Sequence, residues 1–303
     1  MSQKTNALVE LSNALADAVD RIAASTVTVK ARRRVPATGI VWSGDGLVVT
    51  ANHVVERDDE IAVVLPNGSE VAADLVGRDP GSDVAVLKVE TGPELVVAPK
   101  ASAEAKPGQI ILALGRPYGD SPQVAFGAVS VAGSTLGTRG GTRIEGVVRP
   151  DLTMYPGFSG GPLVSASGEV IGMNTSALSR GLPVTIPHAV LESIAAVLRE
   201  KGRIARGYLG VALQPVRIPA NLQQKLEDAQ ETGLLIVGIE PDSPAESGGL
   251  MLGDTIVRFG DRQVSDPRQV HEQLGPDNVG KSLSVRLLRA GEVTETTVTP
   301  GER

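Results

Sequence analysis

Residues 157–163 of the chain read Gly-Phe-Ser-Gly-Gly-Pro-Leu, which places one serine inside a glycine-rich turn that leads into an apolar strand. Glycine tolerates backbone angles that other residues avoid, so such a turn can direct several backbone N–H groups to one point beside the Ser159 hydroxyl. A developing oxyanion requires that arrangement. The same residues also fit an ordinary hairpin turn, and this segment alone leaves both interpretations open.

A serine hydroxyl is a poor nucleophile until a neighbouring base accepts its proton. His53 is the best-placed base, because its segment 50–55, Thr-Ala-Asn-His-Val-Val, carries an apolar strand into a short helical turn. His188 stands at the start of a predicted helix, where the helix dipole disfavours a charged imidazolium. His271 lies in a predicted helix nearer the C-terminus. We interpret His188 and His271 as surface or packing residues.

A base that works through its imidazolium also needs a carboxylate to hold its tautomer. Asp83 is the candidate, because it stands at the head of the apolar run 84–87, where an inward-facing carboxylate would be unusual. Asp79 precedes a proline and fits the first position of a turn. The remaining acidic residues of this region fit a solvated surface: Asp58, Asp59 and Asp74.

The chain order of these three residues is His53, Asp83, Ser159. That order belongs to the chymotrypsin-like double β-barrel and differs from the orders in the subtilisin and α/β-hydrolase folds. Short β-branched runs broken by glycine, proline and asparagine extend from Ser25 to about Pro187, which is the pattern of an antiparallel barrel or sandwich. The sequence therefore predicts a mostly β protein with this double-barrel fold.

The pattern also predicts the limits of the domains. Apolar residues recur at helical spacing within residues 1–24, which predicts an N-terminal amphipathic helix. The barrel domain is expected over 25–202, closed by a helix that ends at Lys201-Gly202. A linker over 203–207 and a small α+β module over 208–303 follow.

Composition excludes several classes of protein. The 303 residues are 41% hydrophobic, carry a net charge of −6 and contain no cysteine. Disordered, collagen-like and disulfide-stabilised chains are thereby excluded, and nothing favours a nucleic-acid partner. No apolar run is long enough for a membrane span. The three histidines lie far apart, and no phosphate-binding or dinucleotide motif occurs, so we expect no metal ion and no cofactor.

Four segments, 50–55, 82–88, 157–163 and 168–175, closely resemble the HtrA (Deg) family of serine proteases. Three more segments of the C-terminal region resemble the PDZ domain that follows the protease in that family: 206–211, 241–245 and 253–256. The resemblance implies a trypsin-like protease domain over 25–202 and a PDZ domain over 208–303.

The resemblance also implies roles for individual residues. Ser159 would attack a peptide carbonyl, His53 would accept its proton, and Asp83 would orient His53. The backbone N–H groups of Gly157 and Ser159 would stabilise the oxyanion. The primary specificity pocket, which would accept a small or medium aliphatic side chain, would be lined by Met154, Ala177 and Leu178.

In the PDZ domain, the resemblance implies that an extended peptide adds a strand to a sheet edge and that backbone N–H groups capture its C-terminal carboxylate. The residues expected at this groove are Tyr208, Leu209, Gly210, Val211, Val270 and Leu274. Val270 and Leu274 would serve equally well as plain core residues.

The leading functional prediction is an ATP-independent serine endopeptidase of protein quality control. It would cleave unfolded or misfolded polypeptides, bind C-terminal peptides and assemble as a homotrimer or higher oligomer. The alternative is a non-cleaving peptide-binding chaperone or adaptor. It is motivated by Phe158, which stands where the family usually has asparagine, and by Gly133-Ser134, which replaces a usual Gly-Arg pair. The N-terminal residues lack the order of an export signal, which predicts a cytoplasmic protein, or a periplasmic or extracellular one if a leader has been removed.

Overall fold

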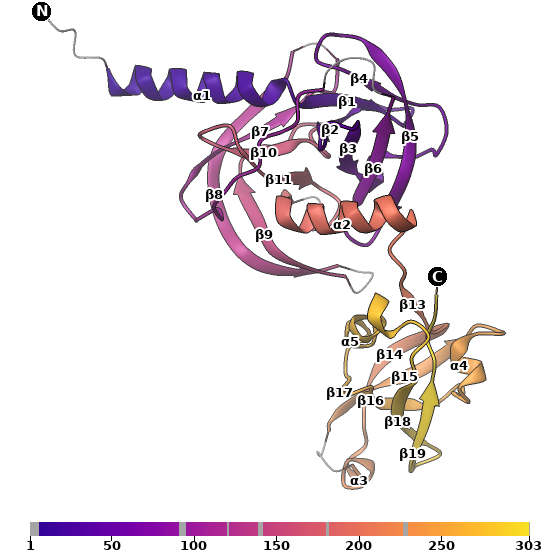
Figure 1. The fold of residues 1–303 in the computed structure, drawn as a ribbon. Coiled ribbons are helices and arrows are strands. Elements are labelled where there is room, and N and C mark those ends of the chain that lie inside the picture. Colours follow the sequence, from indigo (N-terminus) through magenta and orange to yellow (C-terminus); the bar gives the residue numbers. More distant parts are fainter. Residues whose placement is uncertain are drawn as a thin grey trace, which may run out of the picture. The chain divides into compact units, whose positions relative to one another are not determined.

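The computed structural model describes residues 6–90, 95–119, 121–138, 142–179, 182–226 and 230–302. They form two compact units (Figure 1). The first comprises the chain up to Thr138 and Ile144–Ile204, and the second comprises Ala205 onward, with Thr142 and Arg143 grouped with it. Within these ranges, no helix is both long enough and apolar enough to cross a membrane.

The N-terminal part of the first unit is a closed antiparallel barrel with the strand order β1-β2-β3-β6-β5-β4. Its β-branched residues suit strands, and side chains such as Val27, Ile40 and Val86 are fully buried in the core. Closure pairs every strand on both sides and leaves no free edge. The strands are β1 (Thr26–Lys30), β2 (Ala37–Val41), β3 (Leu47–Ala51), β4 (Ile61–Val64), β5 (Glu70–Asp79) and β6 (Val84–Val89).

A second closed barrel follows in the same unit, with the strand order β10-β11-β12-β9-β8-β7. Together the two barrels confirm the predicted chymotrypsin-like double β-barrel. The strands of the second barrel are β7 (Ile110–Gly115), β8 (Gln123–Gly137), β9 (Arg143–Asp151), β10 (Pro162–Ser165), β11 (Val170–Thr175) and β12 (Val184–Pro187).

Strand register decides which loops meet. In the first barrel, β3 pairs with β6 so that Ala51 lies opposite Val84. The residues just beyond this pair, on the turn after β3 and just before β6, are therefore neighbours. In the second barrel, β10 pairs with β11 so that Pro162 lies opposite Met173. The glycine-rich turn before β10 consequently lies beside the end of β11.

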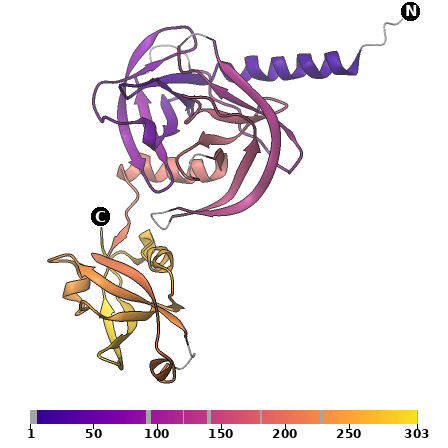
Figure 2. The same cartoon turned by 180° about the vertical axis from the view of Figure 1, so that it is seen from behind.

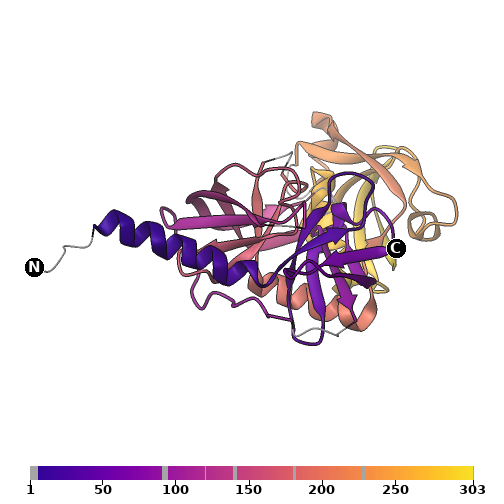
Figure 3. The same cartoon turned by 90° about the horizontal axis from the view of Figure 1, so that it is seen from above.

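Two long helices belong to the first unit. In α1 (Ala7–Ala23), Asn6 caps the N-terminus, and Ala18 and Ile22 are buried against the barrels. Figures 1 and 3 show the rest of α1 running outward from the barrels. In α2 (His188–Lys201), Gly202 adopts φ 72° and ends the helix with a left-handed cap. Figure 2 shows α2 along the outside of the barrels.

The second unit is the predicted small α+β module. Its main sheet has the order β14-β15-β16-β18-β19, with β17 beside β16, and β13 pairs separately with β20. Its core includes Leu234, Phe259 and Val285, all fully buried. The strands are β13 (Gly207–Tyr208), β14 (Val211–Arg217), β15 (Thr232–Ile239), β16 (Thr255–Phe259), β17 (Arg262–Gln263), β18 (Leu283–Arg289), β19 (Glu292–Val298) and β20 (Gly301–Glu302). The helices are α3 (Ala220–Gln223), α4 (Pro244–Ser247) and α5 (Pro267–Gln273), and single 3-10 turns lie at η1 (Asn52–Val54) in the first unit and η2 (Pro276–Asn278) in the second.

Candidate active site

A buried carboxylate holds the histidine after β3 in place. His53 lies in η1, and Asp83 immediately precedes β6. The Nδ1 atom of His53 lies 2.8 Å from Oδ2 and 3.1 Å from Oδ1 of Asp83, and the backbone N–H of His53 donates to Oδ1 at 2.8 Å. The side chain of Asp83 is 3% exposed and that of His53 is 31% exposed. The carboxylate therefore fixes the imidazole on its Nδ1 side, and Nε2 lies on the opposite side of the ring.

The backbone of Asp83 is in a left-handed conformation, with φ 58°. A non-glycine residue in this region is uncommon and costs on the order of 1–3 kcal/mol. The carbonyl oxygen of Asp83 accepts the N–H of Asn52 at 3.0 Å. Asp83 thus holds residues 52 and 53 through both its backbone carbonyl and its side chain. Its strained backbone conformation is maintained by these contacts.

Thr175 completes the surroundings of the carboxylate, and the sequence analysis did not assign it. Its hydroxyl donates to Oδ2 of Asp83, and the residue is fully buried at the end of β11. The signal was present in the sequence, because Asn174-Thr175 is a polar pair at the end of an apolar strand. A buried polar side chain in such a strand needs a partner. Only the packing of β11 against the first barrel identifies that partner as Asp83.

The glycine-rich turn is tied to both barrels. Thr38 in β2 donates its hydroxyl to the carbonyl of Gly157 at 2.6 Å and its N–H to the carbonyl of Ser159 at 3.3 Å. From the second barrel, the carbonyl of Asn174 accepts the N–H of Gly160 at 2.9 Å. Among the residues described, no acceptor is recorded for the N–H groups of Gly157 and Ser159. These are the two donors predicted for an oxyanion, and their role stays a prediction.

Two glycines of this turn are required by the space around them. Gly157 and Gly160 adopt φ 90° and 86°. A Cβ atom at Gly160 would lie 2.1 Å from the carbonyl oxygen of Thr38, and a Cβ atom at Gly157 would lie 2.5 Å from Pro117. A side chain at either position would displace the turn that carries Ser159.

The Ser159 hydroxyl faces a second hydroxyl in this structure. Its Oγ lies 3.3 Å from Oγ of Ser176, and the residue is 8% exposed. Within the described ranges, no hydrogen bond joins Ser159 to His53. Catalytic hydrogen bonds are often long or misaligned before substrate binds.

The three residues expected to line a specificity pocket lie near the turn but differ in their packing. Met154 packs at the edge of the apolar cluster of the second barrel, and Leu178 packs at the edge of the larger core cluster. Ala177 is exposed, and its N–H donates to the hydroxyl of Thr175 at 3.1 Å. The pocket formed by these residues stays a prediction.

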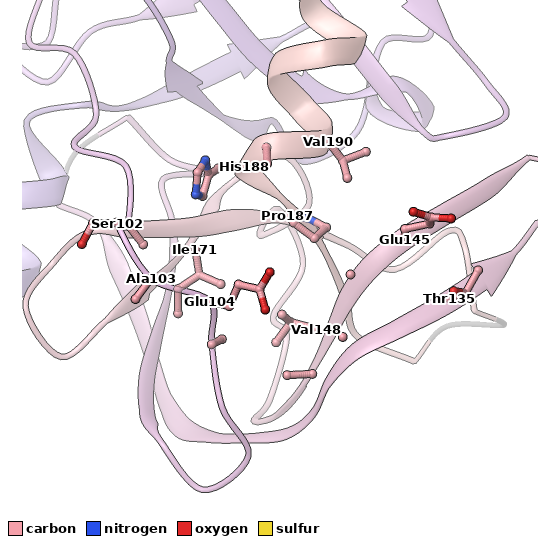
Figure 4. Close-up of a pocket in the computed structure, with 16 residues that line it drawn as sticks. Ser102, Ala103, Glu104, Thr135, Glu145, Val148, Ile171, Pro187, His188 and Val190 are labelled. Carbon is pink, nitrogen blue, oxygen red and sulfur yellow. The ribbon is translucent and has the colours of Figure 1, made fainter.

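A cavity of about 580 Å³ lies elsewhere on the second barrel, and none of the three proposed catalytic residues lines it (Figure 4). Figure 4 shows His188 and Pro187 at the start of α2, with the carboxylates of Glu104 and Glu145 on other parts of the wall. The apolar part of the lining includes Val148 and Ile171, which belong to the core of the second barrel. In the part of the chain that the structure describes, no group of acidic and histidine side chains could hold a metal ion.

The predicted carboxylate-binding loop of the second unit also presents free backbone donors. The carbonyls of Leu209 and Gly210 accept the N–H groups of Ala245 and Glu240, both at 2.9 Å. No acceptor is recorded within the described residues for the N–H groups of Leu209 and Gly210 themselves. The hydroxyl of Tyr208 donates to the carboxylate of Glu240.

Beside this loop, β14 is the end strand of the main sheet, so one of its edges is open to a further strand. Val270 in α5 and Leu274 just after it are 2% and 8% exposed, and both belong to the same apolar cluster as Leu209.

The side-chain hydrogen bond from Arg268 lowers the pKa of Asp266, which caps α5, to about 2. The cap of this helix is therefore charged at neutral pH.

We expect Asp83→Asn to lower the rate at which a fluorophosphonate probe labels Ser159. The amide replaces one of the two acceptor oxygens with an NH2 donor, so it cannot accept from the His53 backbone, the His53 ring and Thr175 together as the carboxylate does. An Asp-to-Asn change in such a triad lowers turnover by about 10⁴. Asp79→Asn is the matched control, because Asp79 is equally buried at 2% exposure and its carboxylate accepts from the turn at Gly81 and Ser82. Wild-type labelling by the Asp83 variant, with an unchanged thermal unfolding temperature, would contradict the assignment.

Comparison with known proteins agrees with this geometry. Residues 37–173 match the family model of the trypsin-like peptidase domain, and residues 207–299 match that of the PDZ domain. A probable periplasmic serine endoprotease DegP-like from Halomonas elongata is 36% identical over 275 residues, which is 89% of this chain and 57% of that protein. The chain thus spans about half the length of the curated relatives it matches.

Solved structures give the same result. The serine endoprotease from Yersinia pestis has a TM-score of 0.75 and 28% identity, and the match covers 95% of this chain and 98% of that one. The HtrA-type protease AlgW with a tripeptide has a TM-score of 0.71 and 30% identity, and the match covers 95% of this chain and 97% of that one. The curated relatives are named as periplasmic, which gives no support to the cytoplasmic prediction. The resemblance noted in the sequence is confirmed, and the chain belongs to the HtrA family of serine proteases.

Proposed function

We propose that the protein is an ATP-independent serine endopeptidase of protein quality control, which cleaves unfolded or misfolded polypeptides through an acyl-enzyme. The observation that carries the proposal is the buried contact between Asp83 and His53, at 2.8 Å, beside a serine turn whose two backbone donors point to no acceptor within the described chain. The match to the trypsin-like peptidase domain and the names of the relatives support the same reaction.

The positions of these groups support an acyl-transfer reaction. Ser159 Oγ attacks the carbonyl carbon of a peptide bond while Nε2 of His53 takes its proton, and Asp83 stabilises the imidazolium that results. The negative charge on the carbonyl oxygen is held by the N–H groups of Gly157 and Ser159. His53 then gives its proton to the leaving amine, and a water molecule activated by the same base hydrolyses the ester.

Ser159→Ala tests the activity directly. Removal of the nucleophile should lower the cleavage of unfolded casein by roughly 10⁴ to 10⁶, measured as the release of acid-soluble peptides. Ser176→Ala is the comparison variant, because it removes the hydroxyl 3.3 Å from Ser159 and leaves the nucleophile in place. If the wild-type chain and the Ser159 variant are equally inert while both still bind casein, the non-cleaving adaptor would be the better description.

We propose further that the PDZ domain binds the C-termini of substrates or activators. The extended peptide would pair with the open edge of β14, and its carboxylate would accept the N–H groups of Leu209 and Gly210. Val270 and Leu274 would form the apolar wall against the last side chain of the peptide. Solved structures of the HtrA-type protease AlgW contain a decapeptide or a tripeptide. These structures support peptides as the class of ligand.

Gly210→Ala should weaken the binding of a C-terminal peptide at least about fivefold, because strain and overpacking in the loop together cost on the order of 1–3 kcal/mol. Gly210 adopts φ 78°, and its Cβ would lie 2.3 Å from Ser243 and 2.9 Å from the Tyr208 hydroxyl. Fluorescence anisotropy measures the affinity, with a C-terminally amidated peptide as the ligand control. Gly280→Ala is the matched protein control, because Gly280 has φ 73° and nothing within 4 Å. Equal losses in both variants would contradict the role of the loop.

We propose that the chain forms a homotrimer or a larger homo-oligomer. Support comes from α1, where Leu8, Val9 and Leu11 are 73%, 50% and 43% exposed, since clustered exposed apolar residues mark association surfaces. Sedimentation velocity should show a species at least three times the mass of the 31.3 kDa chain, and a single species at the mass of one chain would contradict the proposal.

The names of the relatives support a place of action outside the cytoplasm, which fractionation of cells would test.

A further inference from the structure

Phe158 separates the two residues whose backbone N–H groups are the proposed oxyanion donors, and its side chain is fully buried. The side chain at position 158 therefore packs inside the protein and does not face solvent. Any movement of its Cα atom moves Gly157 on one side and Ser159 on the other, because the three residues are consecutive.

The Phe158 ring lies directly on the backbone at the end of β7. A Cβ atom added to Gly115 would lie 2.3 Å from Cδ1 and 2.7 Å from Cε1 of the ring. Tyr155 packs edge-on from the other end of the turn, with ring centroids 5.5 Å apart and an angle of 66° between the planes. Such aromatic pairs have a preferred geometry, so the contact fixes the direction of the ring as well as its depth.

The cluster to which Phe158 belongs is apolar. Phe158 belongs to a buried cluster of the second barrel that also contains Ile111, Ala113, Ala125, Val129, Val148, Leu163 and Ile171. A buried polar side chain at this position would need hydrogen-bond partners that aliphatic neighbours cannot supply.

Thr38 holds the same turn from the first barrel. Its hydroxyl accepts the N–H of Arg116 at 2.8 Å and donates to the carbonyl of Gly157 at 2.6 Å, and its N–H donates to the carbonyl of Ser159 at 3.3 Å. The carbonyls on both sides of Phe158 are thus bonded to one residue, while the Phe158 side chain is held by the opposite barrel. The two constraints together leave the N–H groups of Gly157 and Ser159 unused.

We propose that Phe158 is a positioning residue for the proposed reaction: its ring, seated on Gly115, anchors the oxyanion turn by apolar packing and holds the Gly157 N–H toward the substrate carbonyl. This inference rests on the proposed function, because an effect on the rate of cleavage requires that the protein cleaves. The anchoring of the turn by Phe158 does not require cleavage and can be measured separately.

Three substitutions at Phe158 separate apolar packing from bulk. Phe158→Leu keeps an apolar side chain, and Phe158→Asn gives a polar side chain similar in size to that of leucine. Phe158→Ala removes the contact with Gly115. We expect the Asn and Ala variants to lower kcat for an unfolded substrate by about 10² to 10³, which is the effect of losing one oxyanion donor. KM should stay within about twofold, because the interaction forms in the transition state. The Leu variant should keep kcat within about tenfold of wild type.

A second measurement needs no catalytic activity. Hydrogen exchange of the backbone in peptides covering 155–161 should quicken by about tenfold or more in the Asn and Ala variants. Local opening would release the hydrogen-bonded amides at positions 158, 160 and 161. Ile111→Ala is the matched control, because Ile111 is fully buried in the same cluster but lies in β7 away from the turn. It should change neither kcat nor exchange in 155–161 by more than about threefold.

The outcomes separate the two proposals. A wild-type chain that does not cleave, but whose turn exchanges faster when Phe158 is replaced, would overturn the proposed function and keep the anchor. A cleaving wild type whose Asn and Ala variants retain kcat and the exchange pattern would overturn the anchor alone. Equal losses of kcat in Ile111→Ala and Phe158→Ala would also overturn it, because the effect would then belong to the cluster as a whole.

Discussion

The architecture of the site depends on one buried carboxylate. Asp83 receives the backbone and the ring of His53 from the first barrel and the hydroxyl of Thr175 from the second. A buried charge is tolerated only when it is well supplied with hydrogen bonds, so these donors are required for the carboxylate to be buried at all. The same contacts that orient the imidazole therefore join η1, β6 and β11, and the site and the barrel interface share their hydrogen bonds.

Glycine has the complementary role on the nucleophile side. The turn approaches the first barrel so closely that Gly160 has no room for a side chain, and Thr38 bonds the carbonyls of Gly157 and Ser159. Phe158 is the one residue of the turn that packs into the second barrel. Hydrogen bonds from both barrels and the apolar packing of Phe158 in the second barrel hold the turn, and the N–H groups of Gly157 and Ser159 are left available for a ligand.

The sequence predicted the double barrel, the second α+β unit and the family, because the motifs around His53, Asp83 and Ser159 are local and occur in a distinctive order. Thr175 and Thr38 could not be assigned from sequence, since their roles depend on how β11 and β2 pack across the interface between barrels. The contact of Ser159 with Ser176 depends on a side-chain rotamer, which no sequence pattern encodes. Burial of Phe158 was likewise beyond the sequence, because the space above Gly115 is created by the closure of the second barrel.

The division of the site between two barrels has a consequence for partial folding. The larger apolar cluster joins side chains of both barrels, and the second barrel adds a smaller cluster of its own. His53 and Asp83 come from the first barrel, whereas Ser159 and Thr175 come from the second. A nascent chain that has completed only the N-terminal barrel carries a base with no alcohol to activate. The proposed catalytic residues thus come together only once both barrels have formed and docked.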